Sequence, residues 1–265
     1  MVSEELKLLL SIVNMKILTW NTNGLRARLK DGTLKKVLDL DADVLCFQEI
    51  KLSDELIFLE KCFERYHVYH TLARKKGYSG VCILTKKKAK NVYTNSGFER
   101  ADEEGRYLRI DLDSEHSFLS LYMPHGKRDC SDLSYKLAFA DYLLDMLNNK
   151  IQNSCIICTD FNIAHEEIDL SRPSANRRNI MFTQEERRVV DKLLNNGYID
   201  VFRYLYPNDS SYTWWPYSFD AYQRNMGWRI DYVFIPSIFL ENVRDIILLK
   251  GIRGSDHCPL ILDMD

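Results

Sequence analysis

The 265-residue sequence contains no segment rich in proline, glycine and serine and no low-complexity stretch. Without such a linker, residues 15–265 are predicted to form a single domain. No uninterrupted apolar stretch is long enough to span a bilayer, so nothing indicates a membrane protein or a membrane partner. The formal net charge of −2 also excludes a general attraction to nucleic acid, so a phosphate backbone would need a local basic face.

Four short basic segments could form such a face: residues 74–76, 86–90, 127–128 and 177–178. The 86–90 run is typical of a solvated lysine-rich surface, and we favour that interpretation for it. The N-terminus is not predicted to be a signal peptide, because Glu4 and Glu5 stand where positive charge is needed and Lys7 interrupts the apolar stretch. Met15 looks like a natural start, so residues 1–14 are predicted to be an extension outside the domain.

Seven cysteines, an odd number, lie mostly in apolar runs, which favours a reducing compartment. Cys155 and Cys158 have the spacing of a redox motif. They lie inside an apolar run, however, and strand geometry would point them to opposite faces. We therefore predict a buried strand rather than thiol chemistry, and no second CxxC or His-x-His cluster indicates structural zinc.

Short apolar runs predict a series of strands, and between about 66 and 122 their charged turns favour antiparallel pairing. The predicted strands are 15–20, 44–47, 68–70, 80–84, 107–111, 118–122, 155–159, 199–202, 229–235, 244–249 and 259–263. Helical spacing appears at three places: residues 34–40, 132–149 and 184–195. The second has an apolar stripe of Leu133, Leu137, Ala140, Leu144 and Leu147. The third follows Thr183, an N-cap with Glu186 at capping-box spacing.

Both halves of the chain run strand, helix, strand and then several strands, although no repeat is visible in the sequence. Two sheets packed face to face, with helices outside, would bury these runs. The predicted fold class is therefore α/β.

Polar residues follow several of these strands, where side chains can converge on one cleft. Asn21 and Glu49 each come after an apolar strand, and such an oxygen-rich site suits Mg²⁺ or Mn²⁺. Asp160 and Asn162 would share one strand face, so that a carboxylate could take a proton from water beside an amide. An Asx-turn at the strand end is the alternative for this pair.

His257 lies between a carboxylate, Asp256, and a proline in a tight turn, and Asp231 could orient its imidazole. Tyr122 ends a strand, where a phenol could donate to a phosphate oxygen; a core tyrosine is the alternative. Trp214 and Trp228 could wall a pocket for a flipped-out sugar, and a place in the core is equally compatible with the sequence. Together these residues suit metal-assisted hydrolysis of a phosphate ester.

The order of these clusters resembles the exonuclease III family of abasic-site (AP) endonucleases, over essentially the whole chain from Met15. The segments that carry the resemblance are Trp20-Asn21, Gly24–Ala27, Leu45–Glu49, Gly77–Gly80, Tyr122-x-Pro124, Asp160-Phe161-Asn162, His165–Leu170, Gly227–Tyr232 and Gly254–Pro259. The resemblance implies a four-layer α/β/β/α sandwich of two mainly antiparallel sheets. It also implies hydrolysis of the DNA backbone 5′ to an abasic site, and trimming of 3′ ends.

The resemblance further implies roles for individual residues. Metal binding falls to Asn21 and Glu49, with Asp256 at the metal side and Asp160, Asn162 and His257 close enough to take part. Asp160 would activate water, Asn162 and Tyr122 would act at the phosphate, and Asp231 and His257 would form the carboxylate–histidine pair. Trp214 and Trp228 would hold the sugar. Further DNA contacts are expected at Arg26, Tyr78, His125, Arg128, Asn176 and Arg177.

Two positions depart from the family pattern. Thr159 stands where glycine usually precedes Asp-Phe-Asn, and His125 stands where asparagine usually follows Tyr-x-Pro. An imidazole titrates near neutrality, so we expect incision below pH 7 to depend more on pH than in asparagine-bearing relatives.

The expected partner is duplex DNA with abasic sites or 3′ ends, bound by a monomer in the prokaryotic cytoplasm or the eukaryotic nucleus. Two alternatives remain: a phosphodiesterase or phosphatase of the same fold acting on a lipid or inositol phosphate, and a non-catalytic DNA-binding module.

Overall fold

The computed structural model describes residues 14–53, 62–113, 116–151 and 155–265. The prediction for residues 1–14 lies, except for Asn14, outside these residues. Twelve strands form two six-stranded sheets, which we name sheet A and sheet B. Sheet A has the order β11-β12-β1-β2-β4-β3, with bounds Val243–Leu248, Leu260–Met264, Met15–Asn21, Val44–Gln48, Val81–Thr85 and His67–Thr71. Sheet B has the order β5-β6-β7-β8-β10-β9, with bounds Asn91–Tyr93, Tyr107–Asp111, Ser117–Tyr122, Cys155–Asp160, Asp231–Pro236 and Tyr198–Asp200.

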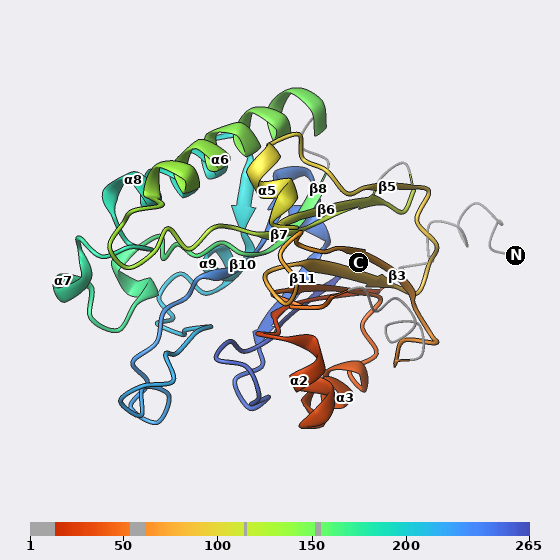
Figure 1. Ribbon diagram of the computed structural model, residues 1–265, viewed down its shortest axis with the longest axis horizontal. Helices are drawn as coiled ribbons and strands as arrows, with labels where there is room; N and C mark the ends of the chain where they lie inside the picture. Colours follow the sequence, from red (N-terminus) through yellow and green to blue (C-terminus); the bar gives the residue numbers. More distant parts are fainter. Residues whose placement is uncertain (1–13, 54–61, 114–115, 152–154) are drawn as a thin grey trace, which may run out of the picture.

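The sheets lie face to face between two layers of helices (Figure 1). Helices α6 (Leu133–Met146) and α8 (Gln184–Asn195) cover sheet B, whereas α2 (Leu25–Lys30) and α3 (Thr33–Leu38) cover sheet A. The remaining helices are short: α5 (Glu99–Glu103), α7 (Pro173–Asn176) and α9 (Val201–Leu205), with 3₁₀ turns at Glu167–Asp169 and Ser237–Asn242. The predicted α/β sandwich is confirmed.

Strand alternation divides the apolar residues among three core layers. Ile17 and Cys158 lie between the two sheets, whereas Leu18 lies under the sheet A helices and Cys155 under the sheet B helices. The two cysteines of the CxxC segment therefore face opposite sides of β8, as predicted, and burial raises the pKa of the Cys155 thiol to about 12. All seven cysteines are free thiols.

The pairing within each sheet is mixed in the same way. β1 pairs in parallel with β2, and β7 pairs in parallel with β8; the other neighbours are antiparallel. Each parallel pair is joined through helices that cross over its own sheet, the connection that parallel strands require. None of the described helices is long and apolar enough to cross a membrane.

Several predicted boundaries were wrong. The run predicted as a strand over 199–202 divides at Asp200: β9 ends there, and the Asp200 side chain accepts a hydrogen bond from Arg203 N, which starts helix α9. The long helix ends at Met146 and continues as a π-helical turn to Ile151. Its buried face is wider than the predicted stripe. Ala140, Leu144 and Leu147 are buried as predicted and Leu133 and Leu137 are half-buried, but Lys136, Phe139 and Leu143 are buried as well. Strand β5 and helices α2, α5, α7 and α9 carried no sequence signal that we used.

Candidate active site

The two parallel strand pairs end at the same edge of the sandwich. In sheet A, Asn21 pairs with Gln48, the residue before Glu49. In sheet B, Tyr122 pairs with Asp160, and Asp160 also pairs with Asp231 at the start of β10. Four strand ends from two sheets therefore deliver polar side chains to one place, as the sequence predicted.

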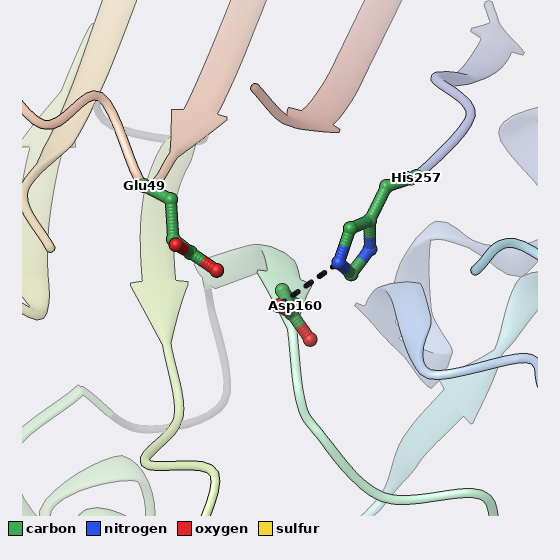
Figure 2. A group of neighbouring side chains, drawn as sticks. All are labelled: Glu49, Asp160 and His257. Carbon is green, nitrogen blue, oxygen red and sulfur yellow. Dashed lines mark ion pairs between the residues drawn. The ribbon is translucent and has the colours of Figure 1, made fainter. Parts of the chain in front are cut away.

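Glu49 and Asp160 meet a third side chain, His257, closely enough for all three to contact one bound atom. Ligand atoms of Glu49, Asp160 and His257 all lie within 4.8 Å of one another, and His257 Nε2 lies 3.9 Å from Asp160 Oδ2. Figure 2 shows the three side chains, which come from the end of β2, the end of β8 and the turn before β12. Two carboxylates at this separation fit a divalent cation, for which carboxylate oxygens are the preferred ligands, whereas an imidazole can join them only in its neutral form.

Asn21 and Tyr122 join the two sheets at this point. The Asn21 amide donates to Glu49 Oε1 at 2.9 Å and to Asp160 Oδ2 at 2.7 Å. The Tyr122 hydroxyl donates to Glu49 Oε1 at 2.8 Å. Without these donors the two carboxylates would repel each other in a buried setting, so both residues also position the acids.

The two carboxylates are in opposite electrostatic environments. Burial raises the pKa of Glu49, but Lys51, whose Nζ lies 2.8 Å from Oε2, together with Asn21 and Tyr122 outweighs burial and lowers it. Burial raises the pKa of Asp160 to about 7, with Asp231 and Glu49 adding to the rise and His257 and Asn21 opposing it. Glu49 therefore stays charged near neutral pH, while Asp160 can exchange a proton.

His257 carries a positive charge at neutral pH. Its Nδ1 lies 2.8 Å from Asp231 Oδ2, and both side chains are buried. Burial lowers the pKa of the imidazole, but the carboxylates of Asp231 and Asp160 outweigh burial and raise it to about 10. The predicted carboxylate–histidine contact is therefore present, and its imidazolium can donate to a phosphate oxygen.

Asn162 reaches the site through a turn rather than along a strand. β8 ends at Asp160, and Asn162 has a left-handed φ of 52°. Its backbone N donates to Asp160 Oδ1 at 3.0 Å, which is the Asx-turn considered as the alternative. The side-chain amide nevertheless lies 3.4 Å from Asp160 Oδ2 and donates to Met123 O at 2.9 Å. Asn162 therefore forms the Asx-turn and also places its side-chain amide beside Asp160.

Asp256 lies outside the group of three. Its carboxylate accepts from Trp214 Nε1 at 3.0 Å and from the Asn23 amide at 2.9 Å, and Asn23 Oδ1 in turn accepts from Lys51. The sequence interpretation assigned no role to Asn23 or Lys51. The sequence could have indicated a role for both residues, because Asn23 and Lys51 lie in the polar turns that follow β1 and β2.

The two tryptophans form a half-buried wall beside the imidazole. The Trp214 ring lies 6.5 Å from Trp228 and 6.3 Å from His257, and Phe182 lies 6.4 Å behind Trp228. Both indoles retain solvent contact, unlike the fully buried Trp20. Their placement suits a pocket wall better than a place in the core.

The positions predicted to contact DNA lie on loops and on two short helices, with Arg26 on α2 and Asn176 on α7. Arg26, Arg128 and Arg177 are exposed, and Asn176 and His125 are half-buried. Arg177 is paired with Glu167 at 3.0 Å, and the exposed Tyr78 accepts from the Arg106 guanidinium at 2.9 Å. These DNA contacts remain predictions. Lys86, in the run predicted to be a solvated surface, forms ion pairs with Asp41 and Asp43.

A buried network of ion pairs centred on Arg229 lies next to the residues that carry Trp228 and Asp231. Arg229 is fully buried and donates to Asp169 at 2.7 Å and to Asp200 at 2.7 Å. These charges neutralise one another and hold the peptide that carries Trp228 and Asp231. The motifs His165–Leu170 and Gly227–Tyr232 therefore meet through their own charged residues.

Comparisons with known proteins agree with this geometry. Residues 18–257 match the Endonuclease/Exonuclease/phosphatase family. An exodeoxyribonuclease of Bacillus subtilis is 39% identical over 94% of this chain and 98% of its own length. The DNA repair nuclease APEX1 of Danio rerio is 37% identical over 94% of this chain and 82% of its own length.

Solved structures give the same result. An AP endonuclease from Archaeoglobus fulgidus superposes with a TM-score of 0.86 at 29% identity, covering 95% of this chain and 99% of that one. A 3′-5′ exonuclease from Neisseria meningitidis superposes with a TM-score of 0.87 at 26% identity, covering 95% and 100%. With the family match, the curated relatives and the convergent strand ends in agreement, the chain belongs to the Endonuclease/Exonuclease/phosphatase family, among its AP endonucleases and exodeoxyribonucleases.

Proposed function

We propose that this protein hydrolyses the phosphodiester 5′ to an abasic site in duplex DNA, leaving a 3′-hydroxyl, and that it also trims 3′ ends. The observation that carries the proposal is the meeting of Glu49, Asp160 and His257 with opposite pKa shifts on the two carboxylates. One charged acid, one proton-exchanging acid and one imidazolium are the groups that phosphodiester hydrolysis needs.

In this proposal Asp160 accepts the proton of the attacking water, because its raised pKa makes it the stronger base of the two acids. The His257 imidazolium donates to a phosphate oxygen and is held in orientation by Asp231. Asn162 and Tyr122 add donors where negative charge grows. Burial and the Glu49 carboxylate raise the pKa of Tyr122 well above its usual range, so its hydroxyl keeps its proton.

Mg²⁺, with Mn²⁺ as the alternative ion, would be held at Glu49 and Asp160, with Asn21, Asn162 and Asp256 as further predicted positions. His257, which the resemblance also offers as a ligand, would not bind the ion while it is an imidazolium. When bound, the cation would neutralise charge on the phosphate and on the departing 3′ oxygen. Trp214 and Trp228 would receive the abasic sugar. The DNA backbone would contact the segments around the site, at Arg26, Tyr78, His125, Arg128, Asn176 and Arg177.

One gel tests the proposal. A labelled duplex with a single abasic analogue is incubated with Mg²⁺, with Mn²⁺ or with chelator, beside the Asp160→Asn variant. We expect incision 5′ to the analogue with either metal and none with chelator. Duplex that is retained but never cut with either ion would indicate a DNA-binding module instead. Release of phosphate from an inositol lipid, with the duplex intact, would indicate the lipid or inositol phosphate alternative.

The proposal includes three broader expectations. Residues 15–265 act as one domain, the protein binds DNA as a monomer, and it works in the prokaryotic cytoplasm or the eukaryotic nucleus. Sedimentation of the protein with and without a short abasic duplex tests the second, since a dimer would bring two copies to one lesion.

A further inference from the structure

Lys136 is a buried cation that the reaction scheme above does not use. It lies on α6, and its side chain has no exposed surface. Its ammonium donates to Glu186 Oε1 at 2.5 Å, to Asn162 O at 2.6 Å and to His125 O at 3.4 Å. All three N–H donors are therefore used, and two of them bind backbone carbonyls of the loops that follow β7 and β8.

Glu186 holds this ammonium in place. It lies in the first turn of α8, is fully buried, and also accepts from Met181 N at 3.0 Å, Thr183 N at 3.0 Å and Thr183 Oγ1 at 2.9 Å. Such complete hydrogen bonding is what a buried charge pair requires. An apolar pair of similar volume commonly stabilises a core as well or better, so packing alone does not account for charges here.

The carbonyl bound by Lys136 belongs to a left-handed turn of the site. Asn162 has a φ of 52°, a conformation that asparagine adopts more readily than most non-glycine residues and that hydrogen bonds on both sides of the residue hold here. The same residue donates its backbone N to Asp160 Oδ1 and its amide to Met123 O. Lys136 holds the peptide group that follows the Asn162 Cα, and Asp160 binds the N–H of the peptide group that precedes it. The φ and ψ of Asn162 therefore link the Lys136 contact to the Asp160 carboxylate and to the Asn162 amide.

We propose that Lys136, anchored by Glu186, is a positioning residue that locks the Asn162 turn and so sets the amide of Asn162 and the carboxylate of Asp160 at the reacting phosphate. This inference rests on the proposed function of those two residues. It gives the covering helices α6 and α8 a direct part in aligning a site formed mainly by strand ends.

The test is the Lys136→Met variant, which removes the ammonium and keeps an unbranched side chain. On abasic duplex we expect kcat to fall about 10- to 100-fold while KM changes less than about threefold, since substrate contacts remain and only alignment is lost. Leu143→Ala is the matched control. It creates a cavity on the same helix about two turns from Lys136, where Leu143 is 2% exposed in the core under sheet B. It should lower the Tm but leave kcat within about twofold.

A double-mutant cycle separates positioning from general destabilisation. If Lys136 acts through Asn162, then Lys136→Met should cost little further kcat in an Asn162→Ala background. Full additivity of the two losses, or a normal kcat for Lys136→Met alone, overturns the inference. Should Lys136→Met fail to fold, Glu186→Gln keeps the shape of the anchor, and its smaller loss of kcat should also vanish in the Asn162→Ala background.

Failure of the inference and failure of the proposed function give different results. If the unaltered protein does not incise abasic duplex, the proposed function is wrong. If it does incise, and Asn162→Ala is impaired while Lys136→Met is not, only the positioning role is wrong.

Discussion

Sheet A places β1 beside β2 in parallel at its centre, and sheet B does the same with β7 and β8. In both sheets the second strand of the pair is followed by a left-handed residue, Glu49 in sheet A and Asn162 in sheet B. The backbone frames match, but the side chains differ in chemistry. Sheet A presents a carboxylate beside a lysine, and sheet B presents a carboxylate buried beside a second carboxylate.

The different neighbours of Glu49 and Asp160 give these two acids different roles in the site. The pKa of Glu49 is lowered and that of Asp160 is raised, although the two acids lie close enough to share a ligand. An acid that stays charged serves as a fixed negative group, and an acid that titrates near neutrality serves as a proton acceptor. Two carboxylates, each at the end of a central parallel strand pair, thus reach different roles through their neighbours.

The hydrogen bonds that hold the Glu49 turn and the Asn162 turn also come from different groups. The carbonyl of Glu49 accepts from the backbone N–H of Gly24 at 2.8 Å, and Gly24 is the N-cap of α2. The carbonyl of Asn162 accepts from the Lys136 ammonium on α6. A helical layer therefore contacts both turns, through backbone N–H groups in sheet A and through a lysine side chain in sheet B.

The largest expected effect follows from removing the proton acceptor in sheet B. Asp160→Asn should lower kcat/KM on abasic duplex by about 10³-fold or more, and added Mg²⁺ should not restore it, because an amide cannot take the proton. Steady-state incision across a Mg²⁺ series measures this. Normal cleavage by the variant would remove the assignment of Asp160 as base.

Asp231→Asn sharpens the sheet B side of the comparison. The Asp231 carboxylate raises the pKa of His257 to about 10, so its removal should bring that pKa down towards the ordinary value. The ring is charged below its pKa and neutral above it. As pH rises, the variant should therefore lose its imidazolium at a lower pH than the parent does. NMR titration of His257 in metal-free protein measures the shift, and we expect kcat to fall about 100-fold. An unchanged imidazole pKa would contradict this account.

Glu49→Gln tests the sheet A side. Its fixed charge should matter for holding the cation rather than for proton transfer, so activity should fall about 10- to 100-fold at low Mg²⁺ and recover in part at high Mg²⁺. The matched comparison is Asp160→Asn, which should show no recovery. Identical metal dependence of the two variants would break the proposed division between the sheets.

The smallest effect is expected at His125, which follows β7. Burial, with help from Lys136, lowers the pKa of this imidazole, so the ring gains its proton only below its usual range. The acid side of the pH–rate profile should therefore differ between the parent and His125→Asn, by about threefold or less near pH 6. Superimposable profiles would exclude a role for His125 titration.

Much of the fold could be predicted because its elements have local causes. The capping box of Thr183 and Glu186 placed the start of α8 correctly, and apolar runs located most strands. Boundaries failed where a single side chain decided between two local structures, as at Asp200, whose carboxylate caps α9 and ends β9. The predicted buried face of α6 left out Lys136, because a lysine predicts solvent exposure and its burial depends on Glu186 from another helix.

The primary sequence determined which polar groups follow which strands, because apolar runs and turn residues act over a few positions. Tertiary structure alone decided that Asn21 joins Glu49 to Asp160, that Asp256 turns towards Asn23 and Trp214, and that Lys136 reaches the Asn162 carbonyl. It also decided the opposite pKa shifts of the two acids. Except for Lys51, which follows Glu49 closely in the sequence, the groups that shift these pKa values come from other strands and turns, up to 139 positions away for Asn21 and Asp160. No local pattern in the chain encodes those contacts.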